Sequence, residues 1–193
     1  MRSEMTCWPF GDLAPYSYGV ILADPPWRFE THSERGNAKG VPYDTMSKRE
    51  LLRLPVHRLA APHCALIMWV SPEQIFFAVD LMKRWGFEGK TMGFWGKLSK
   101  TGNARHFGKG YWFREAGEPF LVGAKGQPKV CSHSERNYIE APVRETSRKP
   151  DELHARLERM FPRARKLELF SRCQRKGWDH WGNQTDFFDP GAA

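Results

Sequence analysis

Cysteine is scarce in this sequence, and its placement excludes two common uses of that residue. Four cysteines occur among 193 residues, and no two of them are separated by two positions. Neither a disulfide framework nor a Cys-x-x-Cys zinc site is therefore expected. We interpret the thiols as reduced, which fits a cytoplasmic protein. The cysteines are Cys7, Cys64, Cys131 and Cys173.

Long hydrophobic runs are also lacking. The longest, Cys64–Val70, is far shorter than the ~20 residues that a membrane-spanning helix needs. The first residues carry no charged segment followed by an apolar one. We therefore expect neither a secretory leader nor an association with a membrane.

Negative charge is in the minority. The chain has 30 lysines and arginines against 22 aspartates and glutamates, which gives a net charge of +8. This balance favours a polyanionic partner, most simply nucleic acid. Hydrophobic residues make up 40% of the sequence, which is enough for a core. At about 150 residues per domain, the length predicts one domain over residues 1–193.

Short apolar segments alternate with amphipathic ones along the chain. This pattern predicts an α/β fold in which helices flank a mostly parallel sheet. Ser47 and Glu50 have the spacing of a capping box at the start of a short helix. The stretches 28–46 and 97–117 are long enough for active-site or substrate loops, and 125–146 is polar and predicted to be irregular. Strands are expected over 18–23, 65–70, 90–95, 119–124, 166–170 and 178–181, and longer helices over 73–85 and 150–160.

The motif with the clearest chemistry is Asp24-Pro25-Pro26-Trp27, directly after the first predicted strand. Ligands of open α/β sheets bind at the carboxyl ends of strands. The Asp24 carboxylate and the Pro25 carbonyl can accept the two N–H bonds of an exocyclic amino group, and the prolines stiffen the turn. Trp27 offers a face on which a flipped base can stack. Taken alone, the motif is explained equally well as a proline turn with a packed tryptophan.

Together with this motif, four further stretches resemble the adenine-N6 methyltransferase family typified by the 70-kDa catalytic subunit of the mRNA adenosine methyltransferase, which includes bacterial and phage members. The resemblance extends from Tyr18 to Gln184. No Gly-rich nucleotide fingerprint precedes Asp24, so the catalytic strand comes first and the cofactor strand last, in the permuted order of this family. The stretches are Val41–Ser47, Gly110–Glu118 with Leu121–Gly123, Ser147–Pro150, and Lys166–Arg172 with Trp181–Gln184.

The resemblance implies a Rossmann-like fold and an activity. The enzyme would move a methyl group from S-adenosylmethionine to the amino nitrogen of adenine in nucleic acid, with no metal and no covalent enzyme intermediate. Asp24 and Lys149 would contact the methionine end of the cofactor, and an ammonium suits its carboxylate. The catalytic residues implied are Asp24, Pro25, Pro26 and Trp27. Arg172, Asn183 and Gln184 would bind around the ribose, with Gln174 as a further candidate. Trp27, Tyr43 and Trp69 could face the sulfonium.

The stretch 97–117 interleaves basic and aromatic residues with glycine, which favours a loop that follows phosphates and helps to stack a base. An ordinary solvated basic loop is the alternative. The substrate-binding candidates are Trp27 and Tyr43 in the base pocket and Arg105, Lys109 and Tyr111 on the loop.

Other functions stay open on the sequence. One is a catalytically inactive, nucleic-acid-binding partner subunit, which the intact motif at 24–27 disfavours. Others are an RNA adenosine methyltransferase, or an enzyme acting on cytosine or on a protein side chain. We expect the protein to be located in the cytoplasm of a prokaryote or a phage-infected cell. In a small chain of that origin, DNA is favoured over RNA as the substrate. We expect a monomer or a homodimer, with a partner subunit as a further option.

Overall fold

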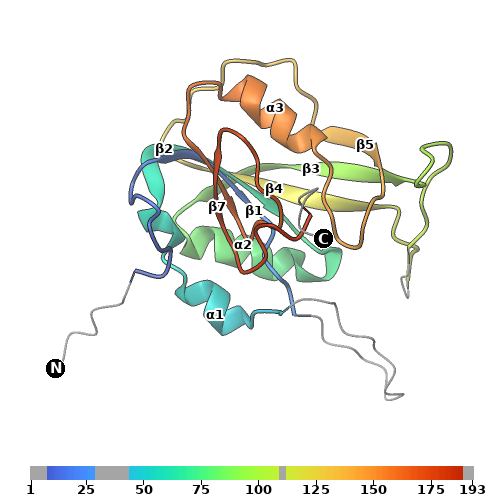
Figure 1. Cartoon of the computed structure of the whole chain (residues 1–193), viewed down its shortest axis with the longest axis horizontal. Helices are drawn as coiled ribbons and strands as arrows, with labels where there is room; N and C mark the ends of the chain where they lie inside the picture. The colour runs from blue at the N-terminus through green and yellow to red at the C-terminus, as the bar shows by residue number, and fades with distance from the viewer. Residues whose placement is uncertain (1–7, 29–43, 109–111, 189–193) are drawn as a thin grey trace.

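The computed structural model describes residues 8–28, 44–108 and 112–188. Seven strands form one sheet with the order β5-β3-β4-β2-β1-β6-β7 (Figure 1). In the described ranges, no helix is both long and apolar enough to cross a membrane. The strands are β1 (Tyr18–Ala23), β2 (Ala60–Trp69), β3 (Glu88–Leu98), β4 (Gly117–Lys125), β5 (Tyr138–Pro142), β6 (Lys166–Leu169) and β7 (Trp178–Trp181). The helices are α1 (Lys48–Arg53), α2 (Ile75–Arg84) and α3 (Glu152–Met160), with short 3-10 turns η1 (Val56–Arg58) and η2 (Pro72–Gln74).

The strand directions place the carboxyl ends of most strands at one edge of the sheet. Among the described pairings, β4 runs antiparallel to β2 and β3, and all others are parallel. The carboxyl ends of the other strands therefore lie at the same edge as the amino end of β4. The first strand, β1, lies between β2 and the late strand β6. This topology confirms the predicted α/β class and permuted order. In such sheets, a ligand crevice is expected at the carboxyl ends of neighbouring strands, here β1 and β6.

The sheet is covered on both faces. Helices α1 and α2 lie on one face and α3 on the other (Figure 1). Side chains of β1 alternate between the two layers: Ile21 and Ala23 belong to the core under α2, and Val20 and Leu22 to the core under α3. A fully buried Val, Leu or Ile side chain contributes about 1.5–3 kcal/mol by leaving water. β1 is therefore anchored from both sides, and its carboxyl end is a rigid place for a functional group.

Local signals in the sequence set several element boundaries as predicted. The Ser47 hydroxyl accepts the N–H of Glu50, and the Glu50 carboxylate accepts the Ser47 N–H at 2.7 Å, which completes the capping box of α1. Pro72 opens the turn that leads into α2. Gly86 ends α2 with φ +85°, a left-handed conformation that suits glycine.

The structure differs from the prediction at β5, which lies within the stretch 125–146 that was expected to be irregular. Only Ile139 and Ala141 of this strand are buried, and the strand forms because it pairs with β3. β2 begins at Ala60, five residues early, because the buried Ala60 pairs with Tyr18 of β1 before an irregularity in the register. β3 continues to Leu98, so the loop predicted over 97–117 begins later.

Candidate active site

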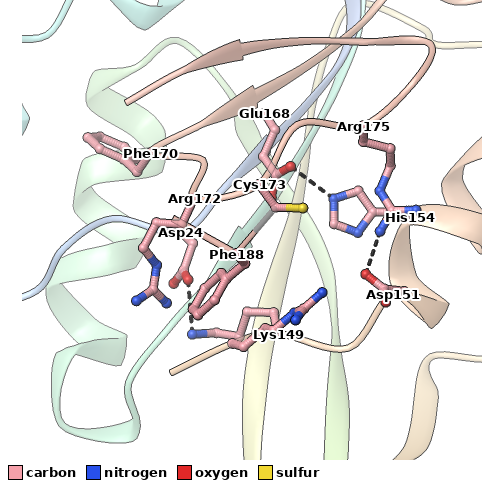
Figure 2. A pocket seen from close by; sticks show the side chains of 11 residues that line it. Asp24, Lys149, Asp151, His154, Glu168, Phe170, Arg172, Cys173, Arg175 and Phe188 are labelled. Carbon is pink, nitrogen blue, oxygen red and sulfur yellow. Dashed lines mark hydrogen bonds and ion pairs between the residues drawn. The ribbon is translucent and has the colours of Figure 1, made fainter. Parts of the chain in front are cut away.

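A cleft lies at the carboxyl ends of β1 and β6, and it has two adjoining parts. Asp24, Phe170 and Arg172 line both parts. Figure 2 shows the first part, where the charged ends of Asp24 and Lys149 point toward each other. Its other lining residues are Arg148, Lys149, Asp151, His154, Glu168, Cys173, Arg175 and Phe188. The second part is completed by Pro25, Pro26, Asp44, Asn183 and Gln184.

The backbone at the ends of β1 and β6 shapes this cleft. The Asp24 N–H donates to the Leu169 carbonyl at 3.3 Å, so the two strands stay joined up to the residue that carries the carboxylate. Phe170 then has φ +62°, a left-handed conformation that costs a non-glycine residue about 1–3 kcal/mol. Its ring packs edge-on against Trp181, with 5.3 Å between centroids. The packed ring holds the strained turn in place at the wall of the cleft.

Lys149 reaches Asp24 from the loop before α3. Its Nζ lies 3.1 Å from Asp24 Oδ2. Arg144 holds the loop, because its guanidinium donates to the Lys149 carbonyl and to the Asp151 carboxylate, both at 2.6 Å. The two residues that the resemblance assigned to the methionine end of the cofactor are therefore brought into direct contact.

Asp24 and Lys149 are the first members of a longer row of charges, which we call the charge chain. Lys149 Nζ lies 3.0 Å from Glu118 Oε1, and Lys97 Nζ lies 3.2 Å from Glu118 Oε2. The four side chains are only 13–21% exposed. They come from the end of β1, the loop before α3, the start of β4 and the end of β3. The charge chain alternates in sign and has no net charge.

Two tryptophans lie beneath the charge chain. Lys149 Nζ is 5.9 Å from the centroid of the Trp69 ring, and Lys97 Nζ is 5.2 Å from that of Trp95. Both rings are buried, and they meet edge to face. Trp69 was a candidate face for the sulfonium of the cofactor. In this structure, the cation over it is the Lys149 ammonium.

Burial and charge act in opposite directions on the ionisable groups. Burial raises the pKa of Asp24 above its ordinary value; Lys149 offsets part of this rise, and the nearby Glu118 carboxylate adds to it. Burial alone would lower the pKa of Lys149, but Asp24 and Glu118 outweigh it and raise that pKa. Burial alone would raise the pKa of Glu118, but Lys149 and Lys97 bring it below its ordinary value. Glu118 is thus the firmly ionised carboxylate, and Asp24 is the one held closer to protonation.

The prolines after Asp24 have fixed carbonyl directions. The Pro25 carbonyl accepts the Trp27 N–H at 2.8 Å, and the Pro26 carbonyl accepts the Met46 N–H at 2.9 Å. A carbonyl oxygen has two lone pairs, so the Pro25 oxygen can accept a second donor. The Asp24 carboxylate and this oxygen are two acceptors on neighbouring residues.

Trp27 lies in the core, contrary to the expectation of an open stacking face. The residue is 6% exposed, and its ring meets Phe77 edge to face at 6.2 Å. Its indole Nε1 is buried with no hydrogen-bond partner among the described residues. The motif's tryptophan therefore supports the turn from below in this structure.

The expected cofactor residues differ in where they lie. Arg172 lines both parts of the cleft, donates to the Ser147 carbonyl at 2.6 Å and lies 4.8 Å from the ring centroid of Phe188. Asn183 and Gln184 line the second part. Gln174 is exposed and is not among the lining residues of either part.

The candidate substrate residues are only partly described. Arg105 is exposed and its backbone bridges to Leu98 at the end of β3. Tyr43, Lys109 and Tyr111 lie outside the described residues. The loop also carries Phe107 and Phe113, which are 72% and 87% exposed.

Glu168 is a further buried carboxylate in the wall of the first part. His154 Nε2 lies 3.1 Å from Glu168 Oε2 (Figure 2). The Ser171 hydroxyl donates to the same oxygen at 3.3 Å. Burial alone would raise the pKa of Glu168, but His154 lowers it below its ordinary value. This group stiffens the wall beside Cys173.

Sequence reasoning missed the roles of Glu118 and Lys97. Glu118 is an acid near the start of β4, before its apolar middle, and Lys97 is a base near the end of β3. A single charge at a strand end usually meets solvent, so the pattern predicts an exposed side chain. Two such charges of opposite sign at strand ends that meet at one edge of the sheet were the available signal.

The MT-A70 family profile matches residues 18–184. The chain is 38% identical over 173 residues to "N(6)-adenosine-methyltransferase MT-A70-like" of Arabidopsis thaliana, covering 88% of this chain and 24% of that protein. It is 33% identical over 173 residues to the human "N(6)-adenosine-methyltransferase catalytic subunit METTL3", covering 88% and 28%. It is 29% identical over 193 residues to "Type II methyltransferase M.MunI" of a Mycoplasma species, covering 90% and 80%. The chain thus spans about a quarter of the length of the plant and human relatives.

Proposed function

The chain belongs to the MT-A70 family, and we propose that it transfers a methyl group from S-adenosylmethionine to the exocyclic amino nitrogen of adenine in DNA. The observation that carries the proposal is the 3.1 Å contact between Asp24 and Lys149 at the edge of the cleft. It puts a carboxylate beside a cation directly before the rigid carbonyl of Pro25.

The residues of the cleft suit the cofactor. S-adenosylmethionine has a carboxylate, an ammonium, ribose hydroxyls and a sulfonium that supplies an electrophilic methyl group when bound. Lys149 is the cation that would hold the carboxylate, and Asp24 would accept from the ammonium. Arg172 lines both parts of the cleft and would bind beside the ribose. The amides of Asn183 and Gln184 would bind the ribose hydroxyls, and both line the second part of the cleft.

The two acceptors at residues 24 and 25 suit an amino group on a flat base. The lone pair of such a nitrogen is delocalised into the ring, which makes it a poor nucleophile. When Asp24 and the Pro25 carbonyl each accept one N–H, the nitrogen is turned so that its lone pair points away from the acceptors. Their fixed positions supply most of the rate by orientation.

The proton balance requires no strong base. The nitrogen forms its bond to the methyl carbon as the bond from sulfur to that carbon breaks. The nitrogen becomes cationic and acidic, and its proton then leaves to Asp24 or to water. Burial of Asp24 raises its pKa, which makes it a better acceptor than an exposed aspartate.

Charge favours a nucleic acid as the acceptor, and the lengths of the alignments are the ground for choosing DNA. The net charge of +8 favours a polyanion, and Arg105 is an exposed cation on the loop that follows β3. The alignment covers 80% of the type II methyltransferase but only about a quarter of the N(6)-adenosine-methyltransferases. On this ground we propose DNA, with RNA as the alternative polymer.

The experiment measures transfer of labelled methyl from S-adenosylmethionine to duplex DNA, single-stranded DNA and RNA of mixed sequence. The product is digested to nucleosides. Asp24→Ala is the blank, and Glu88→Ala, an exposed acid at the far end of β3, is the matched control. Label on adenine of DNA in the wild type and the control, and none in the blank, is the expected result.

Other outcomes would overturn particular parts of the proposal. Label on adenine of RNA alone would overturn the polymer. Label on cytosine would overturn the base. No label on any polymer, with cofactor binding intact, would overturn a stand-alone enzyme in favour of one that needs a partner subunit.

A further inference from the structure

Lys97 is the outermost member of the charge chain, and it lies on the strand that leads into the substrate loop. It pairs with Glu118 across the β3–β4 ladder, where its backbone N–H also donates to the Ala116 carbonyl at 2.8 Å. Its side chain is 20% exposed, so most of its surface is covered by the protein. Nothing in the proposed chemistry uses this residue directly.

We propose that Lys97 is a positioning residue for methyl transfer, which acts through Glu118 and Lys149 on the carboxylate of Asp24. This inference rests on the proposed function for its catalytic consequence. Its electrostatic part stands on the contacts alone.

Glu118 bridges two cations with separate oxygens. Oε1 faces Lys149 at 3.0 Å and Oε2 faces Lys97 at 3.2 Å. Because each oxygen has its own ammonium, Glu118 stays charged in a site where its side chain is 16% exposed. Without Lys97, Oε2 would lose its cation, and Glu118 would either bind a proton or draw Lys149 away from Asp24.

Other charges around the charge chain do not replace Lys97. Arg172 acts on Asp24 at the opposite end. On the side of Lys97, Glu115 and Glu73 add negative charge, and burial raises the pKa of Glu115 while Lys97 lowers it. Removing Lys97 would therefore leave an excess of carboxylates around Glu118, the carboxylate that acts on Asp24.

The strand itself offers a matched control. Lys90 lies on the same β3 and pairs with Glu88 at 2.8 Å, but the two side chains are 47% and 77% exposed. Lys90→Met removes the same charge from the same strand without touching the charge chain.

The first test follows the carboxyl carbons of Asp24 and Glu118 by NMR across pH in the cofactor-free protein. In Lys97→Met, the first protonation of this pair should move up by about half a pH unit or more, because an opposite charge has been lost nearby. Lys90→Met should titrate like the wild type. If the first protonation in Lys97→Met occurs within about 0.2 pH units of the wild type, the proposal is overturned. If Lys97→Met does not fold, Lys97→Gln serves in its place.

The second test separates positioning from direct contact with phosphate. Lys97→Met should lower kcat about 5- to 20-fold, while KM for DNA and the salt dependence of binding change by less than about twofold. Lys97→Arg, which keeps the charge, should recover most of kcat. A raised KM and a smaller salt slope with kcat unchanged would mean a phosphate contact and would overturn the proposal.

A double substitution tests the route through Glu118. If Lys97 acts only through that carboxylate, Lys97→Met should change kcat by less than about twofold in a Glu118→Gln background. Full additivity of the two losses would overturn the route. Should the wild-type chain methylate no polymer, the proposed function fails, but the carboxyl titration still decides the electrostatic link because it needs no substrate.

Discussion

At one end of β3, Lys90 pairs with Glu88 at 2.8 Å, and at the other end Lys97 pairs with Glu118 at 3.2 Å. The first pair is 47% and 77% exposed and stands alone, whereas the second is 20% and 16% exposed and continues to Lys149. The distances are nearly the same, so the surroundings make the difference. Exposed pairs are typically worth about 0–1 kcal/mol, because water already solvates both partners.

The inner pair has a different physical meaning. Removing one partner of a buried pair costs about 3–5 kcal/mol, because the remaining charge is left without water or a counter-charge. A fold gains little stability from such an arrangement compared with apolar packing. We interpret its presence at the carboxyl ends of the strands as the means of holding Asp24 in a fixed charge state and direction.

The largest expected effect comes from removing the carboxylate that the charge chain serves. Asp24→Ala should lower the rate of single-turnover methyl transfer by about a thousandfold. The amino nitrogen loses a positioned hydrogen-bond acceptor, and water does not take up the same fixed position. Thermal unfolding should show an intact fold. Glu88→Ala should leave the rate unchanged, and substantial methylation by Asp24→Ala would sink the catalytic assignment.

Lys149→Met and Lys90→Met compare the two kinds of ion pair by their effect on the free energy of unfolding. Lys149→Met leaves Asp24 without its ion pair and Glu118 with one, so the free energy of unfolding should fall by about 3–5 kcal/mol. Lys90→Met should lower it by less than about 1 kcal/mol. Urea unfolding measures both, and equal losses in the two variants would contradict the distinction between the ends of β3.

The second part of the cleft should behave differently, because neutral amides line it. Asn183→Ala combined with Gln184→Ala should weaken S-adenosylmethionine binding about tenfold or more, as expected for two lost hydrogen bonds. Stability should hardly change, since neither side chain is buried. Calorimetry gives the affinity, and an unchanged value would move the cofactor elsewhere.

The smallest effect is expected on the loop. Arg105→Ala should reduce the slope of log affinity for DNA against log salt by about one unit, the loss of one phosphate contact. Binding titrations at several salt concentrations measure it. With an unchanged slope, Arg105 would be an ordinary solvated residue.

Short-range patterns were enough to predict much of the fold. β1 and the capping box of α1 were found in the sequence because their signals lie within a few neighbouring residues. β5 was missed because it exists through pairing with β3, and Ile139 and Ala141 alone give no local pattern. Strand pairing between distant segments is a tertiary property that a local pattern does not contain.

The site shows the same division. Asp24 and Lys149 were identified by motif resemblance, but Glu118 and Lys97 became visible only when the register of β3 and β4 brought them together. Trp27 was expected to be open because aromatic residues near a base-binding motif commonly stack. Its burial against Phe77 follows from the packing beneath β1 and α2, which the motif does not encode.

The most direct test of the account is the pH dependence of single-turnover methyl transfer at saturating cofactor and DNA. Asp24 must be ionised to accept an N–H, and burial raises its pKa above the ordinary value of 3.8. As the pH is lowered, the rate should therefore begin to fall while the pH is still clearly above the range in which an exposed aspartate titrates. The pKa of Lys149 is raised as well, so its ammonium stays charged at the alkaline end of the assay and adds no second limb. A rate that stays constant down to the range of an exposed aspartate would contradict the claim that a buried, ionised Asp24 carries the reaction.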